Sequence, residues 1–416
     1  MTTITPALLD DIRSRFAHVD TCPFTGPRVF FENAGGALTL NAVVDTTAKF
    51  AAIPDNQGRD NAASRALVSV IDTARADAAT FLNARGGRIV VGESGTELLF
   101  RLIADACLGA PDGVVLGSTL EHPASRSACA RWAGVAGKRH VLIPHDDTTG
   151  VVTPQAYAAH VTPDVMVATI LHTSPVTGMA MDLPGIAAAI RAVAPDALIV
   201  VDGIQHACHG RVDLAAAGVD GYVISPYKMF SRHGYGLAWA SDRLSALRHD
   251  ALIGAPEGSW ELGTRDTGAY ATFSDVVGYF DWLGARVSDA SDRRARIEAA
   301  GRAIHDHEAV LTNAMLHGTG NLPGLAEMRG VGIVGGVDNP AREGLVSFYV
   351  EGRASPDIVR ALSDEGIRVH TRKADGYSGN VLTPLGRPDC VRVSLCHYNT
   401  EGEVGAFLAA MKRILG

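Results

Sequence analysis

The sequence lacks several features that would mark a membrane, secreted or nucleic-acid-binding protein. No apolar run among its 416 residues approaches the ~18 residues of a membrane span, and the longest, "VMVATIL", is strand-sized. The N-terminal stretch "MTTITPALLDDIRSRF" has no apolar core, which argues against a secretory signal. There is no basic block, and the net charge is −8, so we expect no nucleic-acid partner. These absences predict a cytoplasmic protein without a membrane partner.

Cysteine is scarce and unpaired along the chain. No CxxC pair occurs among the six cysteines, which are Cys22, Cys107, Cys129, Cys208, Cys390 and Cys396. Scattered cysteines in a large chain are typical of reduced thiols rather than of a disulfide framework.

The stretch "HDHE" (305–308) places two histidines two residues apart on a predicted helix, where their side chains point in different directions, so we expect a surface stretch there. We therefore predict no metal site.

Short apolar runs alternate with helical patterns through the middle of the chain. The predicted strands are "GRIVVGES", "GVVLGST", "HVLIPHD", "DVMVATILHTS", "ALIVVDG", "DGYVIS" and "GLAWAS". Near-continuous apolar strands separated by helices indicate a parallel sheet that is covered on both faces. The sequence thus predicts an α/β fold whose large domain has a mostly parallel seven-stranded sheet.

The pattern changes after about residue 285. A long amphipathic helix is predicted over "DRRARIEAAGRAIHDHEAVLTNAML", followed by strands "GLVSFYV", "GIRVHT" and "CVRVSL" with helices between and after them. This indicates a smaller α+β domain at the C-terminus. We predict a large domain over 21–285, a small domain over 286–416, and an N-terminal segment (1–20) that packs on the small domain.

Two polar side chains follow two predicted strands and indicate a cofactor. Asp202 ends "ALIVVD", with Gln205 one turn on, and Lys228 follows "YVISPY". Ligands bind beyond the carboxyl ends of strands in open parallel sheets. A lysine and a carboxylate there are typical of pyridoxal phosphate, whose aldehyde forms a Schiff base with lysine and whose ring nitrogen pairs with the carboxylate. Taken singly, Asp202 is equally explained as a turn residue and Lys228 as a surface lysine.

The segment "ESGTELLFRLIA" (93–104) predicts a phosphate site at the start of a helix. Gly95 lets the backbone approach a ligand closely, and Thr96 offers a hydroxyl beside free amide donors. A simple N-cap by Ser94 or Thr96 is the alternative, and the two roles are compatible.

Seven motifs in order resemble the class V aminotransferase superfamily of fold-type I pyridoxal phosphate enzymes, and more narrowly its cysteine-desulfurase-like branch. They are "VFFENAGGAL", "SGTELLFRLIA", "LEHPAS", "VVDGIQ", "SPYK", "ELGTRD" and "VRVSLCHYNTEGEV". The resemblance covers roughly residues 28–412. It implies a homodimer with shared active sites and a small amino-acid substrate.

The resemblance also implies a role for individual residues. Lys228 would carry the cofactor and move the Cα proton, and His122 would stack on the cofactor ring. Asp202 and Gln205 would contact the ring nitrogen and the phenolic oxygen. The phosphate would be held by Gly95, Thr96, Ser225, Tyr227 and, from the neighbouring subunit, Thr264. Arg392 would bind the substrate α-carboxylate through a bidentate pair, with Asn33 nearby.

The sequence departs from the family pattern at three places. The stretch before Arg392 has no cysteine until Cys390, which is predicted to lie on a strand, so the usual persulfide chemistry is not expected. Pro175 stands where the family has an asparagine, which removes one polar contact, and Tyr227 stands where it has a histidine. The segment "HTRKADGYSG" brings Arg372 and its neighbours toward the predicted mouth, where they would select an acidic or polar substrate tail unless they form a solvated loop.

Three functions follow as alternatives. The first is a carbon–sulfur lyase that eliminates a thiol from cysteine or a cysteine S-conjugate, which needs no persulfide cysteine. The second is an aminotransferase, or a decarboxylating or deaminating enzyme, acting on a specialised amino acid. The third is a binding protein that keeps the fold without catalysis, against which Lys228, Asp202 and Arg392 argue.

Overall fold

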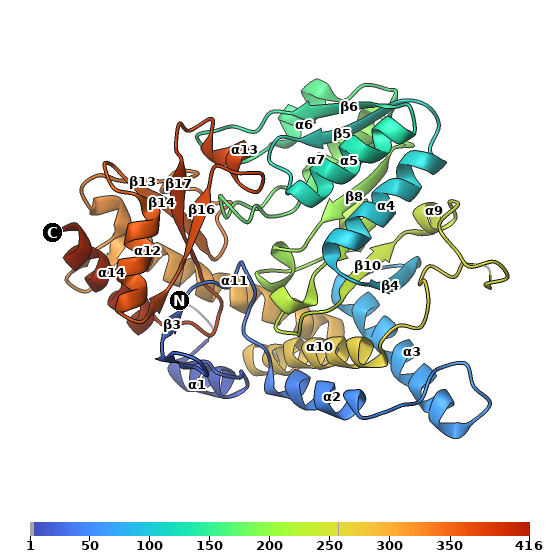
Figure 1. Ribbon diagram of the computed structural model, residues 1–416, viewed down its shortest axis with the longest axis horizontal. Helices are drawn as coiled ribbons and strands as arrows, with labels where there is room; N and C mark the ends of the chain where they lie inside the picture. The colour runs from blue at the N-terminus through green and yellow to red at the C-terminus, as the bar shows by residue number, and fades with distance from the viewer. Residues whose placement is uncertain (1–3, 257) are drawn as a thin grey trace.

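The computed structural model describes residues 4–256 and 258–416, and its central element is a seven-stranded sheet (Figure 1). The strand order is β4-β10-β9-β8-β7-β5-β6. The strands are β4 (Arg88–Gly92), β5 (Val114–Ser118), β6 (Arg139–Ile143), β7 (Val165–Leu171), β8 (Leu198–Asp202), β9 (Gly221–Ile224) and β10 (Gly236–Ala240). β10 is antiparallel to both its neighbours and the other pairings are parallel. All seven strands predicted from apolar runs are present, and the mostly parallel sheet is confirmed.

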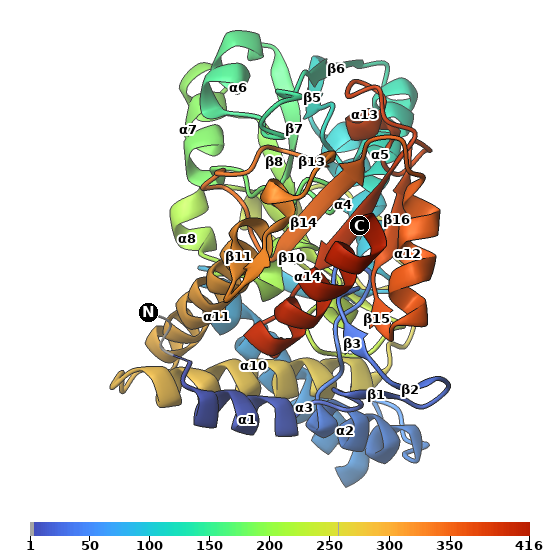
Figure 2. The ribbon, with the colours of Figure 1, turned by 90° about the vertical axis from the view of Figure 1, so that its left-hand side faces the viewer.

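Helices cover both faces of this sheet, as Figure 2 shows. On one side lie α4 (Gly95–Gly109) and α5 (Pro123–Val135), and on the other α6 (Pro154–His160), α7 (Leu183–Val193) and α8 (Leu214–Ala217). Along β8, Leu198 and Val200 join the apolar cluster around α4, whereas Ile199 and Val201 join the cluster on the opposite face. Successive side chains of a strand point to opposite faces of the sheet. A strand in a sheet that helices cover on both faces therefore needs apolar residues at every position.

Long helices underlie the sheet and connect it to the C-terminal part. α10 (Thr267–Val287) packs against α2 (Asn41–Ala51), α3 (Ala62–Leu82) and α11 (Arg293–His317), and a short α9 (Asp242–Ser245) follows β10. α11 is the long amphipathic helix that the sequence predicts. α1 (Pro6–Ser14) ends beside the C-terminal part, where Arg13 donates to the Tyr398 carbonyl (2.5 Å). Of the helices in the described ranges, none combines the length and apolar composition that crossing a bilayer requires.

The C-terminal part is built on a four-stranded antiparallel sheet with the order β13-β14-β17-β16. Its elements are β13 (Val331–Ile333), β14 (Leu345–Val350), α12 (Ser355–Asp364), β16 (His370–Lys373), α13 (Gly379–Leu382), β17 (Asp389–Ser394) and α14 (Glu401–Leu415). Two-residue strands form three further pairs, β1 (Thr21–Cys22) with β2 (Gly26–Pro27), β3 (Val29–Phe30) with β15 (Ile367–Arg368), and β11 (Gly318–Thr319) with β12 (Leu322–Pro323). The domain boundaries near residues 20 and 285 stay a prediction.

The two faces of the small sheet differ in chemistry. Val391 and Val393 of β17 point into the apolar cluster that includes α14 residues such as Phe407. Arg392 lies between them and therefore points to the opposite face. That face meets the large sheet, because Ser347, the register partner of Arg392, donates to the Val176 carbonyl (2.6 Å) just beyond β7. The small sheet thus presents Arg392 to the carboxyl ends of the large sheet's strands.

Candidate active site

A cavity lies at the carboxyl ends of the parallel strands, where the sequence places its candidate residues. Its lining comes from the ends of β7 and β8, from the starts of α4 and α5, and from the short turns that follow β7, β8 and β9. The lining residues are Thr96, His122, Leu171, Thr173, Pro175, Asp202, Ile204, Gln205, Ser225, Tyr227 and Lys228. Seven residues predicted to hold a cofactor therefore meet in one cavity.

Lys228 lies in the helical turn that follows β9, with its amine at the cavity. Its Nζ donates to Gln205 Oε1 (3.4 Å). Burial and the nearby Arg392 cation lower the pKa of Lys228 to about 8, because both disfavour a second positive charge. Two residues on, Phe230 has φ 67°, a left-handed conformation that is costly for a bulky side chain. The Leu40 amide donates to the Phe230 carbonyl (2.9 Å), which fixes this turn.

Asp202 is a buried carboxylate at the end of β8, with 3% of its surface exposed. Its Oδ1 accepts a hydrogen bond from the Ile204 amide (3.1 Å), and it forms no ion pair within the described residues. Burial raises the pKa of Asp202 to about 6, against the effect of Lys228. Glu121 is fully buried nearby, where burial and Asp202 raise its pKa to about 8. Of the two carboxyl groups, Asp202 therefore loses its proton more readily than Glu121 near pH 7.

The start of α4 closes tightly on the residues after β9. Ser94 caps the helix by accepting a hydrogen bond from the Glu97 amide (3.1 Å). The Thr96 hydroxyl is therefore not needed for the cap. A Cβ at Gly95 would stand 2.4 Å from Ser225 Oγ and 2.6 Å from Ile204 Cδ1, so any other residue there would have to displace these side chains. Free helix amides, two hydroxyls and a close backbone approach together make an anion site.

His122 and Tyr227 line the cavity from two other turns. His122 caps α5, with Nδ1 accepting from the Ala124 amide (3.2 Å), which leaves Nε2 to carry the proton of a neutral ring. Burial, followed by Lys228 and Arg372, lowers the pKa of His122 to about 4. Tyr227 stacks on the His233 ring with centroids 4.3 Å apart. The His122 ring is therefore uncharged at neutral pH, and burial raises the pKa of Tyr227 above its ordinary value.

Arg392, on the small sheet, contacts the edge of the cavity at Pro175, the residue that departs from the family pattern. Its Nη1 donates to the Pro175 carbonyl (3.0 Å), while its Nε is buried without a hydrogen-bond partner among the residues that the structure describes. The backbone at Pro175 thus supplies a polar contact that its side chain cannot.

Asn33 supports the turn beside Arg392. Its Nδ2 donates to the Ser394 carbonyl (2.8 Å), and Tyr398 donates its hydroxyl to Asn33 Oδ1. In the same turn, a Cβ at Gly35 would lie 3.6 Å from Arg392 Nη2.

Thr264, by contrast, lies outside this cavity. It is exposed and lines a separate hollow formed by residues 50–57 and 264–268. Neighbouring Arg265 pairs with Glu93, just before α4. The cavity around Lys228 is therefore formed without Thr264 of the same chain.

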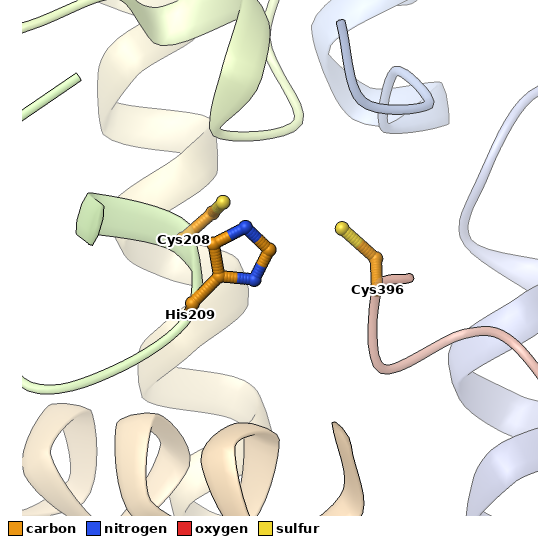
Figure 3. Close-up of side chains that lie close together, drawn as sticks. All are labelled: Cys208, His209 and Cys396. Atoms are coloured by element: carbon orange, nitrogen blue, oxygen red, sulfur yellow. The ribbon is translucent and has the colours of Figure 1, made fainter. Parts of the chain in front are cut away.

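Sequence reasoning missed a buried network behind Gln205. Figure 3 shows Cys208 and His209 facing Cys396, and their potential ligand atoms lie within 4.8 Å of one another. His209 Nδ1 pairs with Glu308 Oε2 (2.8 Å) and its Nε2 lies 3.2 Å from the Gln205 amide nitrogen. These contacts orient Gln205, whose oxygen accepts from Lys228.

A sequence signal for this network existed on α11. Glu308 falls four residues after Ile304 and three before Leu311, on the buried stripe of the helix. The expected surface stretch at "HDHE" is accordingly wrong for His307 and Glu308, which are buried, because this face of α11 packs under the site.

The residues of the cavity fit pyridoxal phosphate. Asp202 is a buried carboxylate without an ionic partner, and Lys228 is an amine whose pKa favours the neutral form more than usual. Because Gly95 has no side chain, Ser225 can lie close to the start of α4, where the first amides of the helix can face an anion. When bound, this cofactor supplies an electron sink for a negative charge at the substrate Cα.

Comparison with known proteins agrees with this fit. The aminotransferase class-V family model matches residues 29–259 and 297–407. A probable cysteine desulfurase of Pseudomonas putida is 30% identical over 351 residues, covering 82% of this chain and 81% of that protein. The aminotransferase-like protein FGM3 of Gibberella zeae is 26% identical over 430 residues, covering 98% of both.

A solved structure supports the same fold. The apo structure of a cysteine desulfurase from Thermococcus onnurineus NA1 superposes with a TM-score of 0.80 at 21% identity, covering 98% of both chains. The order of strands, the cavity at their carboxyl ends and the family match all agree. The chain is therefore a pyridoxal phosphate-dependent enzyme that belongs to the class V aminotransferase family, in its cysteine-desulfurase-like branch.

Proposed function

We propose that this enzyme is a carbon–sulfur lyase that eliminates a thiol from cysteine or a cysteine S-conjugate. The observation that carries the proposal is a cavity that holds Lys228, has no cysteine in its lining, and is contacted by Arg392 of the small sheet through the carbonyl of the lining residue Pro175. All six cysteines are buried. A thiol that leaves freely needs no protein nucleophile to receive the sulfur.

The roles of individual residues belong to the same proposal. Arg392 binds the α-carboxylate, and Lys228 Nζ takes the proton from Cα. Asp202 and Gln205 hold the two polar positions of the cofactor ring, and His122, uncharged at pH 7, stacks on its face. Gly95, Thr96, Ser225 and Tyr227 hold the phosphate.

The assembly and its setting are also proposals. Thr264 reaches the phosphate of the neighbouring subunit, a role that its exposure and its absence from its own chain's cavity lining support. The enzyme is then a cytoplasmic homodimer in which two chains complete each site.

The second candidate is an aminotransferase or decarboxylating enzyme, favoured by the replacement of a family asparagine with Pro175. The test incubates the loaded enzyme with cysteine, S-methylcysteine, alanine or glutamate. Release of thiol, keto acid and ammonia in equal amounts supports the lyase. A lasting change of the cofactor spectrum that a keto acid reverses supports transamination and contradicts the lyase.

A further inference from the structure

A second guanidinium lies beside Arg392 on the face of the small sheet that meets the cavity. In the β16–β17 register, His370 pairs with Arg392 and Arg372 pairs with Cys390. Paired residues share a face, and so do residues two apart on one strand. Arg372 is therefore the diagonal neighbour of Arg392. Arg372 is close enough to lower the pKa of Arg392, and both arginines lower the pKa of Lys228.

Neither arginine is neutralised within the part of the chain that the structure describes. Arg392, with 4% of its surface exposed, donates to a carbonyl and forms no ion pair. Arg372 donates from Nε to Ser378 Oγ (2.7 Å) and from Nη2 to the Tyr377 carbonyl (3.3 Å), and it also forms no ion pair. A buried charge without a partner is costly, so the buried Arg392 is suited to binding a ligand, and the half-buried Arg372 offers a second cation without an ion-pair partner.

Two carboxylates act on the arginines electrostatically, Glu32 on Arg392 and Asp375 on Arg372, but neither lies within ion-pair distance of them. Glu32 lies 3.5 Å from His370 Nδ1, and Asp375 accepts from the Tyr377 amide (2.9 Å). Asp375 is exposed, and Arg372 is half-buried among its hydrogen-bond partners.

Arg372 is held in place toward the cavity rather than free in solvent. Its Nε bond to the buried Ser378 fixes the guanidinium plane. Arg372 lies close enough to His122 to lower the pKa of that ring, and His122 lines the cavity. Tyr377, from the same loop, lies with its ring 6.2 Å from the His122 ring. The loop after β16 thus reaches the edge of the cavity at His122.

We propose that the substrate carries a second negative charge on its side chain, which Arg372 binds while Arg392 binds the α-carboxylate. This inference rests on the proposed function and names its substrate class. Two chemical classes fit: a cysteine S-conjugate that ends in a carboxylate or sulfonate, which suits the lyase, and a dicarboxylic amino acid, which suits the second candidate function. Arg372 donates to the side-chain anion as a charged, directional partner.

The test compares ligands that differ only in charge. Equilibrium binding to the loaded enzyme is measured from the cofactor spectrum for S-carboxymethylcysteine against S-carbamoylmethylcysteine, and for aspartate against asparagine. We expect the acidic member of at least one pair to bind ~10-fold or more tighter. The pair that shows the preference identifies the substrate class.

Variants assign the preference to Arg372. In Arg372→Gln the ratio of acidic to neutral affinity falls toward one, whereas Lys373→Gln, which removes the same charge from an exposed neighbour, keeps the ratio of the original enzyme. Equal affinities within both pairs overturn the inference, as does an equal effect of the two variants. Weaker cofactor binding in Arg372→Gln also overturns it, since Arg372 would then serve the phosphate. If no amino acid of any charge alters the spectrum, the proposed function itself is wrong.

Discussion

The contact between Gly95 and Ser225 gives the sharpest prediction for the phosphate site. In Gly95→Ala, the new methyl group would stand 2.4 Å from Ser225 Oγ and 2.6 Å from Ile204 Cδ1. The end of the Ile204 side chain can rotate away, but the Ser225 hydroxyl must leave the position in which it faces the cavity. Alanine is also a better helix former than glycine, so α4 itself should persist.

The size of the effect follows from the hydrogen bond at stake. A hydrogen bond to a charged group contributes roughly 1.5–3 kcal/mol, which corresponds to a ~10- to 150-fold weaker affinity for the cofactor. Overpacking adds about 1–3 kcal/mol of destabilisation to the cofactor-free protein. Both effects are expected together in Gly95→Ala.

The assay titrates cofactor-free protein with pyridoxal phosphate and follows thermal unfolding in parallel. Gly278→Ala is the matched control, because a Cβ there meets no atom within 4 Å. It should bind the cofactor as the original protein does. A dissociation constant for Gly95→Ala within twofold of the original would refute the assignment of α4 as the phosphate site.

Three further predictions follow from the buried charges. In cofactor-free protein, the rate at which the Lys228 amine reacts with small aldehydes should rise with a midpoint near pH 8, since the reactive neutral amine forms as pH rises through its lowered pKa. Arg392→Gln should move that midpoint to higher pH. An unchanged midpoint would contradict the assignment of part of the shift to Arg392. Glu308→Ala leaves His209 without its buried partner and should cost about 3–5 kcal/mol in chemical unfolding, with Glu308→Gln losing less. Asp202→Ala should weaken cofactor affinity ~10-fold or more, and full activity in this variant would overturn its pairing with the ring nitrogen.

The sequence predicts the large sheet well for a physical reason. Strands such as β8, buried on both faces, need apolar residues at every position, and that leaves a continuous run in the sequence. Asp202 and Lys228 follow such runs directly, so their meeting at one edge follows from the parallel arrangement of β8 and β9.

Contacts between distant segments could not be predicted in this way. Glu308 pairs with His209 across 99 residues, and Arg392 meets a backbone carbonyl at Pro175 that no side-chain pattern indicates. The proximity of Arg372 to Arg392 depends on the register of β16 against β17, and a shift by one residue would turn Arg372 to the other face.

The central claim is that Lys228 carries the cofactor, and one measurement tests it directly. The protein is loaded with pyridoxal phosphate, reduced with borohydride to make the attachment permanent, digested and analysed by mass spectrometry. The account predicts one modified peptide that contains Lys228, and none in Lys228→Ala. Modification of another lysine, or none at saturating cofactor, would contradict it.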